Sequence, residues 1–132
     1  MAALVGCLQQ TYEEALEYAK TRVQGGKPIL EHPMIAVKLS DMRIKIEAAR
    51  LLVYKNAWSH DNECELDHKM FFLTKGFVNE IGPKIALDAM EILGGIGTDK
   101  DVPMQKNLRD IIEQLHLFGL PSMAMLTGRP EL

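Results

Sequence analysis

Two Glu-x-x-His pairs are the residues most able to bind a metal: Glu65 with His68, and Glu113 with His116. Di-iron helical bundles use such pairs on two helices and single carboxylates on two others. The competing interpretation is that these side chains are solvated surface charges. Glu65 and His68 fall at a helix start beside a polar segment, whereas a metal cage needs both pairs at one depth in the bundle. We therefore predict no metal site, although three further carboxylates could supply the single ligands: Glu14, Glu17 and Glu47.

The segment 94–97, which reads Gly-Gly-Ile-Gly, has a composition that could cradle a phosphate. Dinucleotide-binding loops follow a strand and open a helix, but this segment follows a predicted helix. A helix C-cap and turn therefore explains it better. Arg22 falls in the last turn of the first predicted helix, where the helix dipole favours a cation, and its alternative role is anion binding. Composition and spacing alone identify no enzyme active site.

The overall charge and the two cysteines exclude several classes of protein. The 132 residues carry a net charge of −3 and no cluster of Lys and Arg, which excludes nucleic acid because phosphate binding needs concentrated positive charge. We find no run of 18 apolar residues that could span a membrane, and no secretory-type segment after Met1. Cys7 and Cys64 lie far apart, which fits two free thiols in a reducing compartment. We predict a cytoplasmic protein.

The composition favours an all-α fold in one domain, residues 1–132. Hydrophobic residues make up 47% of the chain, enough to bury a core and to argue against disorder. Aromatic residues make up only 6%, while there are 8 methionines. That balance suits helix-on-helix packing better than an aromatic-rich sheet.

Apolar periodicity predicts the first two helices. One runs from Leu4 to Val23 and stops at Gly25-Gly26, after which we expect a short loop. The next begins near Pro33, which suits a first helical turn, and the polar residues 59–63 predict the loop that follows it. Extra apolar residues on this second helix, Ile44, Leu51 and Leu52, predict a central helix with neighbours on more than one side. Its main seam has the spacing of a helical bundle: Ile35, Leu39, Met42, Ile46, Ala49 and Val53.

Two more long segments complete the predicted bundle. A helix from Glu65 to Leu93 contains Pro83, where we expect a kink and no break. A shorter helix follows Pro103, and an irregular joint at 118–121 precedes a last helical piece that ends near Gly128. The sequence thus predicts an up-down bundle of four main helices. The expected inward residues of the two segments are Met70, Leu73, Phe77, Ile81, Ile85, Ala89 and Ile92, and then Leu108, Ile111, Ile112 and Leu115.

Three segments together resemble one family. They are 22–29, which reads RVQGGKPI, 38–50, which contains KLSDM and EAAR, and 88–97, which reads DAMEILGGIG. Their order and intervals are similar to those of the C-terminal helical domain of acyl-CoA dehydrogenases, and 103–110 extends the match. Each motif is weak alone, but their joint register is fairly specific. The resemblance covers nearly the whole chain and corresponds to only about the last third of such an enzyme. It therefore implies that this chain is a C-terminal part of a larger flavoprotein.

The resemblance implies a bundle that packs against upstream domains of the same protein and forms much of a homodimer or homotetramer interface. It also implies FAD, which accepts a hydride from an acyl-CoA substrate while a carboxylate removes the α-proton, and an electron-accepting flavoprotein as partner. Residues that match Arg22 and Gln24 contact FAD across the subunit interface. The resemblance also implies that the Gly94-Gly95 turn lies against the adenosine pyrophosphate, near the position of Glu91.

The sequence departs from the family pattern at the cofactor site and at the catalytic position. Gly25 stands where the family usually has Phe, and Glu91 where it usually has Gln, so we expect weakened FAD binding. Phe118 occupies the position of the usual catalytic Glu and cannot accept a proton. Either the base lies upstream of Met1, or the chemistry has been lost. Glu113, five positions before Phe118, would need a rearranged joint to replace it.

Two functions remain open. The first is the C-terminal domain of an FAD-dependent acyl-CoA dehydrogenase-family oxidoreductase of fatty acid metabolism, which provides FAD contacts and an oligomer interface and is inactive alone. The alternative is a non-catalytic assembly or binding module on the same scaffold. In either case, apolar surface that meets other domains and subunits should be exposed in this chain.

Overall fold

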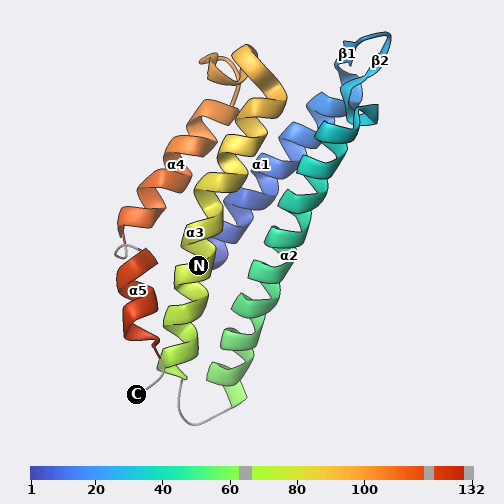
Figure 1. The fold of residues 1–132 in the computed structure, drawn as a ribbon. Helices are drawn as coiled ribbons and strands as arrows, with labels where there is room; N and C mark the ends of the chain where they lie inside the picture. The colour runs from blue at the N-terminus through green and yellow to red at the C-terminus, as the bar shows by residue number, and fades with distance from the viewer. Residues whose placement is uncertain (63–66, 118–120, 130–132) are drawn as a thin grey trace.

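The computed structural model describes residues 1–62, 67–117 and 121–129. The long helices alternate in direction along the bundle, and α5 continues downward beyond α4 (Figure 1). This arrangement confirms the predicted all-α, up-down four-helix bundle with a short last helix. The helices are α1 (Ala2–Thr21), α2 (Pro33–Asn62), α3 (His68–Leu93), α4 (Met104–Leu117) and α5 (Pro121–Thr127).

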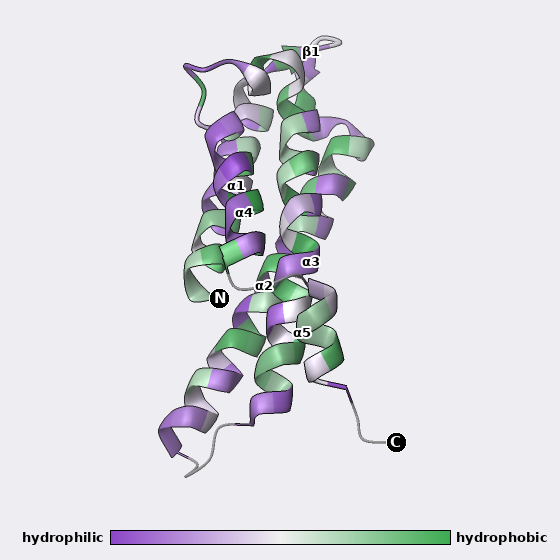
Figure 2. Cartoon of the chain, turned by 90° about the vertical axis from the view of Figure 1, so that its left-hand side faces the viewer, coloured by the Kyte–Doolittle hydropathy of each residue, from purple (hydrophilic) through white to green (hydrophobic). Residues whose placement is uncertain are grey.

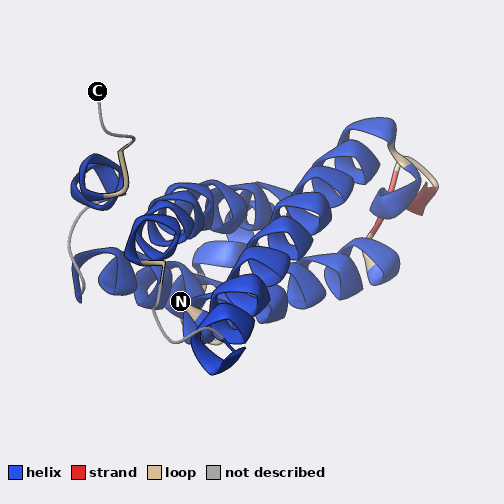
Figure 3. Ribbon diagram, turned by 90° about the horizontal axis from the view of Figure 1, so that it is seen from below, coloured by secondary structure: helices blue, strands red, loops and turns tan. Residues whose placement is uncertain are grey.

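A small hairpin connects α1 to α2, where the sequence predicted a loop. The predicted helix end at Val23 is wrong, because α1 ends at Thr21 and Val23 lies in the first strand of the hairpin. Strands β1 (Val23–Gln24) and β2 (Lys27–Pro28) pair antiparallel and lie at one end of the bundle (Figure 3). The two glycines between them have φ values of +64° and +81°, and a two-residue turn with positive φ at both positions matches the twist of a hairpin. The 3-10 helix η1 (Ile29–Glu31) then leads into α2.

The centre of the bundle is α3, which contacts each of the other four α-helices. The prediction that the second helix lies centrally is therefore wrong. Gly76 shows why α3 can hold this position, since a Cβ there would lie only 2.7 Å from Cγ of Met125 in α5. The absent side chain lets α5 approach the α3 backbone closely.

One face of α2 is buried as predicted, and the other is not covered. Leu39, Met42 and Ile46 lie in the core against α1 and α3. Ile44 and Leu51 are 70% and 66% exposed, so the expected second set of neighbours is not provided by the described part of this chain. Figure 2, coloured by hydropathy, shows hydrophobic and hydrophilic residues alternating along the helices.

The predicted loop at 59–63 is wrong for residues 59–62, because α2 continues to Asn62, while residue 63 lies outside the described ranges. The side-chain amide of Asn62 donates to the Trp58 carbonyl at 2.8 Å. Such polar residues are tolerated at this exposed end, because water solvates the side chains and the last carbonyls of the helix. Polar composition alone therefore placed the helix end too early.

The helix α3 begins at His68 with Asp67 as its cap, whose carboxylate accepts from the Met70 N–H at 2.9 Å. The predicted start, residue 65, lies outside the described ranges. The helix is unbroken through Pro83. Of its predicted seam, Leu73 is exposed, whereas the upper part is buried as expected: Ile81, Ile85, Ala89 and Ile92.

The helices after α3 follow the predicted order, while residues 118–120 of the predicted irregular joint lie outside the described ranges and Pro121 begins α5. The 3-10 helix η2 (Gly94–Thr98) ends α3 at the glycine cluster, as predicted. In α4, Ile111 and Leu115 are buried, but Ile112 faces outward, so its predicted inward placement is wrong. A neighbour one position from a buried residue lies about 100° around the helix, which puts Ile112 at the edge of the apolar face.

Candidate functional site

A cleft of about 760 Å³ lies at the end of the bundle where α1 ends, the hairpin turns, α2 begins and α3 ends. Four of the five residues that the resemblance assigned to cofactor binding line it, although they come from segments far apart in the sequence. Gly95, the fifth, does not line it. The lining residues are Tyr18, Arg22, Gln24, Gly25, Ile29, His32, Pro33, Met34, Ile35, Glu91, Ile92, Leu93 and Gly94.

The backbone of Arg22 is fixed on both sides of the residue. It follows the last residue of α1 in an extended conformation, and its N–H donates to the Tyr18 carbonyl at 2.9 Å. Its carbonyl accepts from the Ile29 N–H at 2.8 Å. The side chain is exposed, and within the described residues the guanidinium makes no hydrogen bond or ion pair. A cation that is always charged is therefore available to an anion at the cleft.

The hairpin is tied to the start of α2 through His32. Its Nε2 lies 3.0 Å from the Gln24 carbonyl oxygen and donates in the tautomer that carries the proton there. The His32 carbonyl in turn accepts from the N–H groups of Ile35 and Ala36 in α2. The sequence reasoning missed His32, because a histidine before a helix has no distinguishing local pattern.

The opposite wall of the cleft is the end of α3. Gly94 caps this helix with φ of +64° and ψ of −145°, a region that is close to glycine-only, and its N–H donates to the Met90 carbonyl. Ile92 and Leu93 are buried in the core beside the cleft. The glycine cluster is thus a helix cap, as the sequence indicated, and one of its residues also faces the cleft.

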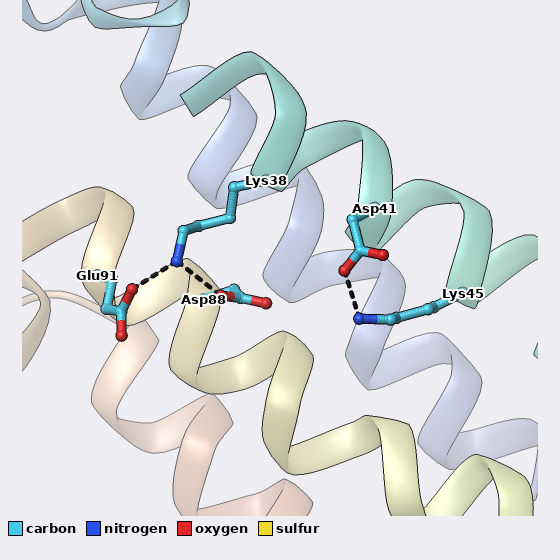
Figure 4. A network of polar contacts seen from close by, with 5 residues as sticks. All are labelled: Lys38, Asp41, Lys45, Asp88 and Glu91. Atoms are coloured by element: carbon cyan, nitrogen blue, oxygen red, sulfur yellow. Dashed lines mark hydrogen bonds and ion pairs between the residues drawn. The ribbon is translucent and has the colours of Figure 1, made fainter. Parts of the chain in front are cut away.

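A three-residue charge network joins α2 to this wall (Figure 4). The ammonium of Lys38 donates to Asp88 at 2.7 Å and to Glu91 at 2.5 Å. The hydrogen bonds to Asp88 and then to Glu91 raise the pKa of Lys38 above its ordinary value, despite its partial burial. Asp41 and Lys45 form a separate pair on the same helix. The negative charge expected at Glu91 is therefore partly offset by a cation that the sequence reasoning missed.

A second cavity of about 460 Å³ adjoins the cleft along α2 and α3. Pro33 and Met34 line both cavities. Lys38 and Asp88 line only the second cavity, while Glu91 lines only the first. The charge network therefore crosses the boundary between the two cavities.

The structure does not assemble the metal site that the Glu-x-x-His spacing suggested. Among the described residues, no group of three or more His, Cys, Asp or Glu side chains could hold an ion. His68, Glu113 and His116 are exposed, and Glu65 lies outside the described ranges. The other candidate carboxylates bind neighbours: Glu14 accepts from Gln10 and Asn107, Glu17 pairs with Lys20, and Glu47 pairs with Arg43 and Arg50.

Several sequence predictions fall on undescribed residues. Phe118, at the family's catalytic position, lies outside the described ranges, as does Cys64. Glu113 is exposed on α4, and Cys7 is a free, half-buried thiol. Within the described ranges, no helix combines the length and apolar character needed to cross a membrane.

Comparison with known proteins identifies the family. Residues 1–113 match the family model described as acyl-CoA dehydrogenase, C-terminal domain. An acyl-CoA dehydrogenase from Bacillus subtilis (strain 168) is 41% identical over 109 residues, which are 83% of this chain and 28% of that protein. The short-chain specific acyl-CoA dehydrogenase of Megasphaera elsdenii is 32% identical over an alignment of 133 positions, which covers 96% of this chain and 33% of that protein.

Solved structures agree with this assignment. Butyryl-CoA dehydrogenase from Megasphaera elsdenii superimposes with a TM-score of 0.89 at 29% identity, covering 95% of this chain and 32% of that one. The FAD complex of PigA gives a TM-score of 0.87 at 27% identity, covering 94% and 32%. The chain spans about a third of the length of these relatives. It belongs to the acyl-CoA dehydrogenase family and corresponds to that family's C-terminal helical domain.

Proposed function

We propose that this chain is the cofactor-binding and assembly domain of an FAD-dependent acyl-CoA dehydrogenase-family oxidoreductase, and that its cleft receives the adenosine pyrophosphate part of FAD. One observation carries the proposal. Arg22 and Gln24, at the hairpin, line the same cleft as Glu91 and Gly94, at the end of α3. These are the residues whose counterparts bind FAD in the family that the sequence resembles.

The residues of the cleft fit such a group. The Arg22 guanidinium has no partner among the described residues and can bind a phosphate oxygen. The walls contain the apolar side chains of Ile29, Ile35 and Ile92, which suit the flat face of an adenine ring. Gly25 leaves that wall without the aromatic side chain usual in the family, so we expect weaker contact there.

When bound, FAD supplies the hydride acceptor for α,β-dehydrogenation of an acyl-CoA thioester. The contribution of this chain is to bind and orient the cofactor, because Phe118 gives no base at the usual catalytic position. In an active dehydrogenase of this family, a carboxylate from another part of the intact protein would remove the α-proton. If no such base exists, the protein is a binding module without dehydrogenase activity.

The outer face of α2 supports the proposed assembly role. Four exposed apolar residues recur every seven positions, which places them in one line along the outer face of the helix: Val37, Ile44, Leu51 and Trp58. We propose that this face packs against upstream domains of the same protein or a second copy in a homodimer or homotetramer. Electrons would then leave the cofactor to an electron-accepting flavoprotein.

Absorbance spectroscopy of the complete gene product tests the proposal. The proposal predicts a flavin spectrum that an acyl-CoA bleaches. A flavin spectrum that no acyl-CoA bleaches would support cofactor binding without dehydrogenation. A protein that remains colourless after incubation with FAD would overturn the proposal.

A further inference from the structure

We propose that Lys38 is a positioning residue for the cofactor cleft: it holds the carboxylate of Glu91 and lowers the negative potential that an approaching pyrophosphate meets. The inference rests on the proposed function, because it concerns the same cleft. The residue on which Lys38 acts, Glu91, departs from the family pattern, because a neutral Gln is usual at that position.

The contacts give Lys38 a directed role. Its side chain is 26% exposed and that of Asp88 is 25% exposed, whereas that of Glu91 is 69% exposed. Asp88 on α3 is therefore the less exposed partner, with its carboxylate 2.7 Å from the Lys38 ammonium. The more exposed carboxylate of Glu91 lies 2.5 Å from the same ammonium. Because Glu91 is the only one of the three that lines the cleft, Lys38 acts on the cleft through Glu91.

The charge balance shows what removal of Lys38 would do. Two carboxylates and one ammonium leave the network with a net charge of −1, and the exposed guanidinium of Arg22 faces the same cleft. Without Lys38 the network would carry −2, and Glu91 would be free to move toward an anionic ligand. Repulsion between the Glu91 carboxylate and the anionic ligand would then weaken binding. Because the carboxylate is exposed to solvent, salt would screen this repulsion.

A merely structural role for Lys38 makes a different prediction. In that case the network only ties α2 to α3, and its loss would lower stability without regard to the charge at position 91. The two roles are separated by measuring FAD binding in variants in which the charge of Glu91 is also removed.

The experiment is an equilibrium titration of the apo form of the complete gene product with FAD, followed by flavin fluorescence. Lys38→Met should raise the Kd about threefold to tenfold at low salt, and the effect should shrink as ionic strength rises. Glu91→Gln should lower the Kd by a similar factor. In the Lys38→Met, Glu91→Gln double variant, the cost of losing Lys38 should fall below about twofold.

Matched variants keep the test decisive. Lys45→Met removes a lysine from the same helix that pairs only with Asp41 among the described residues, and it should leave the Kd unchanged. Glu91→Met removes the charge without adding an amide, so it should reproduce the gain of Glu91→Gln. If Lys38→Met does not fold, Glu91→Gln and Glu91→Met still decide the matter.

A Kd that neither Glu91 variant lowers would overturn the inference, as would an undiminished effect of Lys38→Met in the Glu91→Gln background. The proposed function would stand in both cases, because the parent protein still binds FAD. A parent protein that binds no FAD would overturn both proposals.

Discussion

The two faces of α2 have similar apolar character and different neighbours. On the inner face, Met42 and Ile46 are fully buried against the rest of the bundle. On the outer face, Ile44 and Leu51 are exposed, although Ile44 lies between Met42 and Ile46 in the sequence. Apolar periodicity in the sequence therefore predicts that a helix face is covered. Only the tertiary structure shows whether the same chain covers it.

The largest expected effect comes from the inner face. Ile46→Ala should lower the free energy of unfolding by about 2–5 kcal/mol, because it removes buried methylene groups and leaves a cavity in the core. Denaturant unfolding of the 132-residue chain measures this. Ile44→Ala, two positions earlier on the exposed outer face, is the matched control and should lower the free energy of unfolding by less than about 1 kcal/mol. Equal losses of unfolding free energy in Ile46→Ala and Ile44→Ala would contradict the claim that only the inner face is buried.

The outer face should control association. Leu51→Glu should leave the unfolding free energy of the monomer within about 0.5 kcal/mol but weaken self-association by on the order of tenfold or more, because it places a charge in the proposed interface. Sedimentation equilibrium of the parent and variant checks this. Lys106→Glu, a charge reversal at an exposed residue of α4, serves as control for the general effect of added negative charge. A parent chain that stays monomeric at high concentration would contradict packing of this face against a second copy and would leave only the upstream domains as its partner.

Lys38 lies between the two faces and should show the smallest effect. Its pKa is raised in the folded state, so its contribution to stability is fully present below the unfolded pKa, about 10.5, and is lost as pH rises through the folded value. The parent chain should therefore lose up to about 1 kcal/mol more than Lys38→Met between pH 9 and pH 12. Urea unfolding across this pH range measures the difference, and parallel curves for the two proteins would count against the network.

Much of the bundle was predictable because helix formation is read locally. The seam of Leu39, Met42 and Ile46 and the glycine cap at Gly94 follow from spacing and residue type. The central position of α3 was not predictable from the sequence, because it depends on contacts such as the close packing of Gly76 against Met125 in α5. The hairpin was read as a loop, since two-residue strands carry no periodic signal.

The cleft was predictable only in part, and its residues were brought together mainly by the family resemblance. Arg22, Gln24, Glu91 and Gly94 were named from motifs, and the fold brings them to one place. His32 and Lys38 were missed, because their importance depends on contacts with Gln24 and with Asp88 and Glu91. The expected penalty of Glu91 could not be judged from sequence, since its partner lies 53 residues away.

The most direct test of the account is the affinity of the complete gene product for FAD when Arg22 is changed. Arg22→Ala should raise the Kd by about tenfold or more, because a charged hydrogen bond to phosphate is lost. Lys20→Ala, which removes an exposed lysine from the same end of α1, should leave it unchanged. An FAD affinity that Arg22→Ala does not alter would contradict the claim that this cleft holds the cofactor.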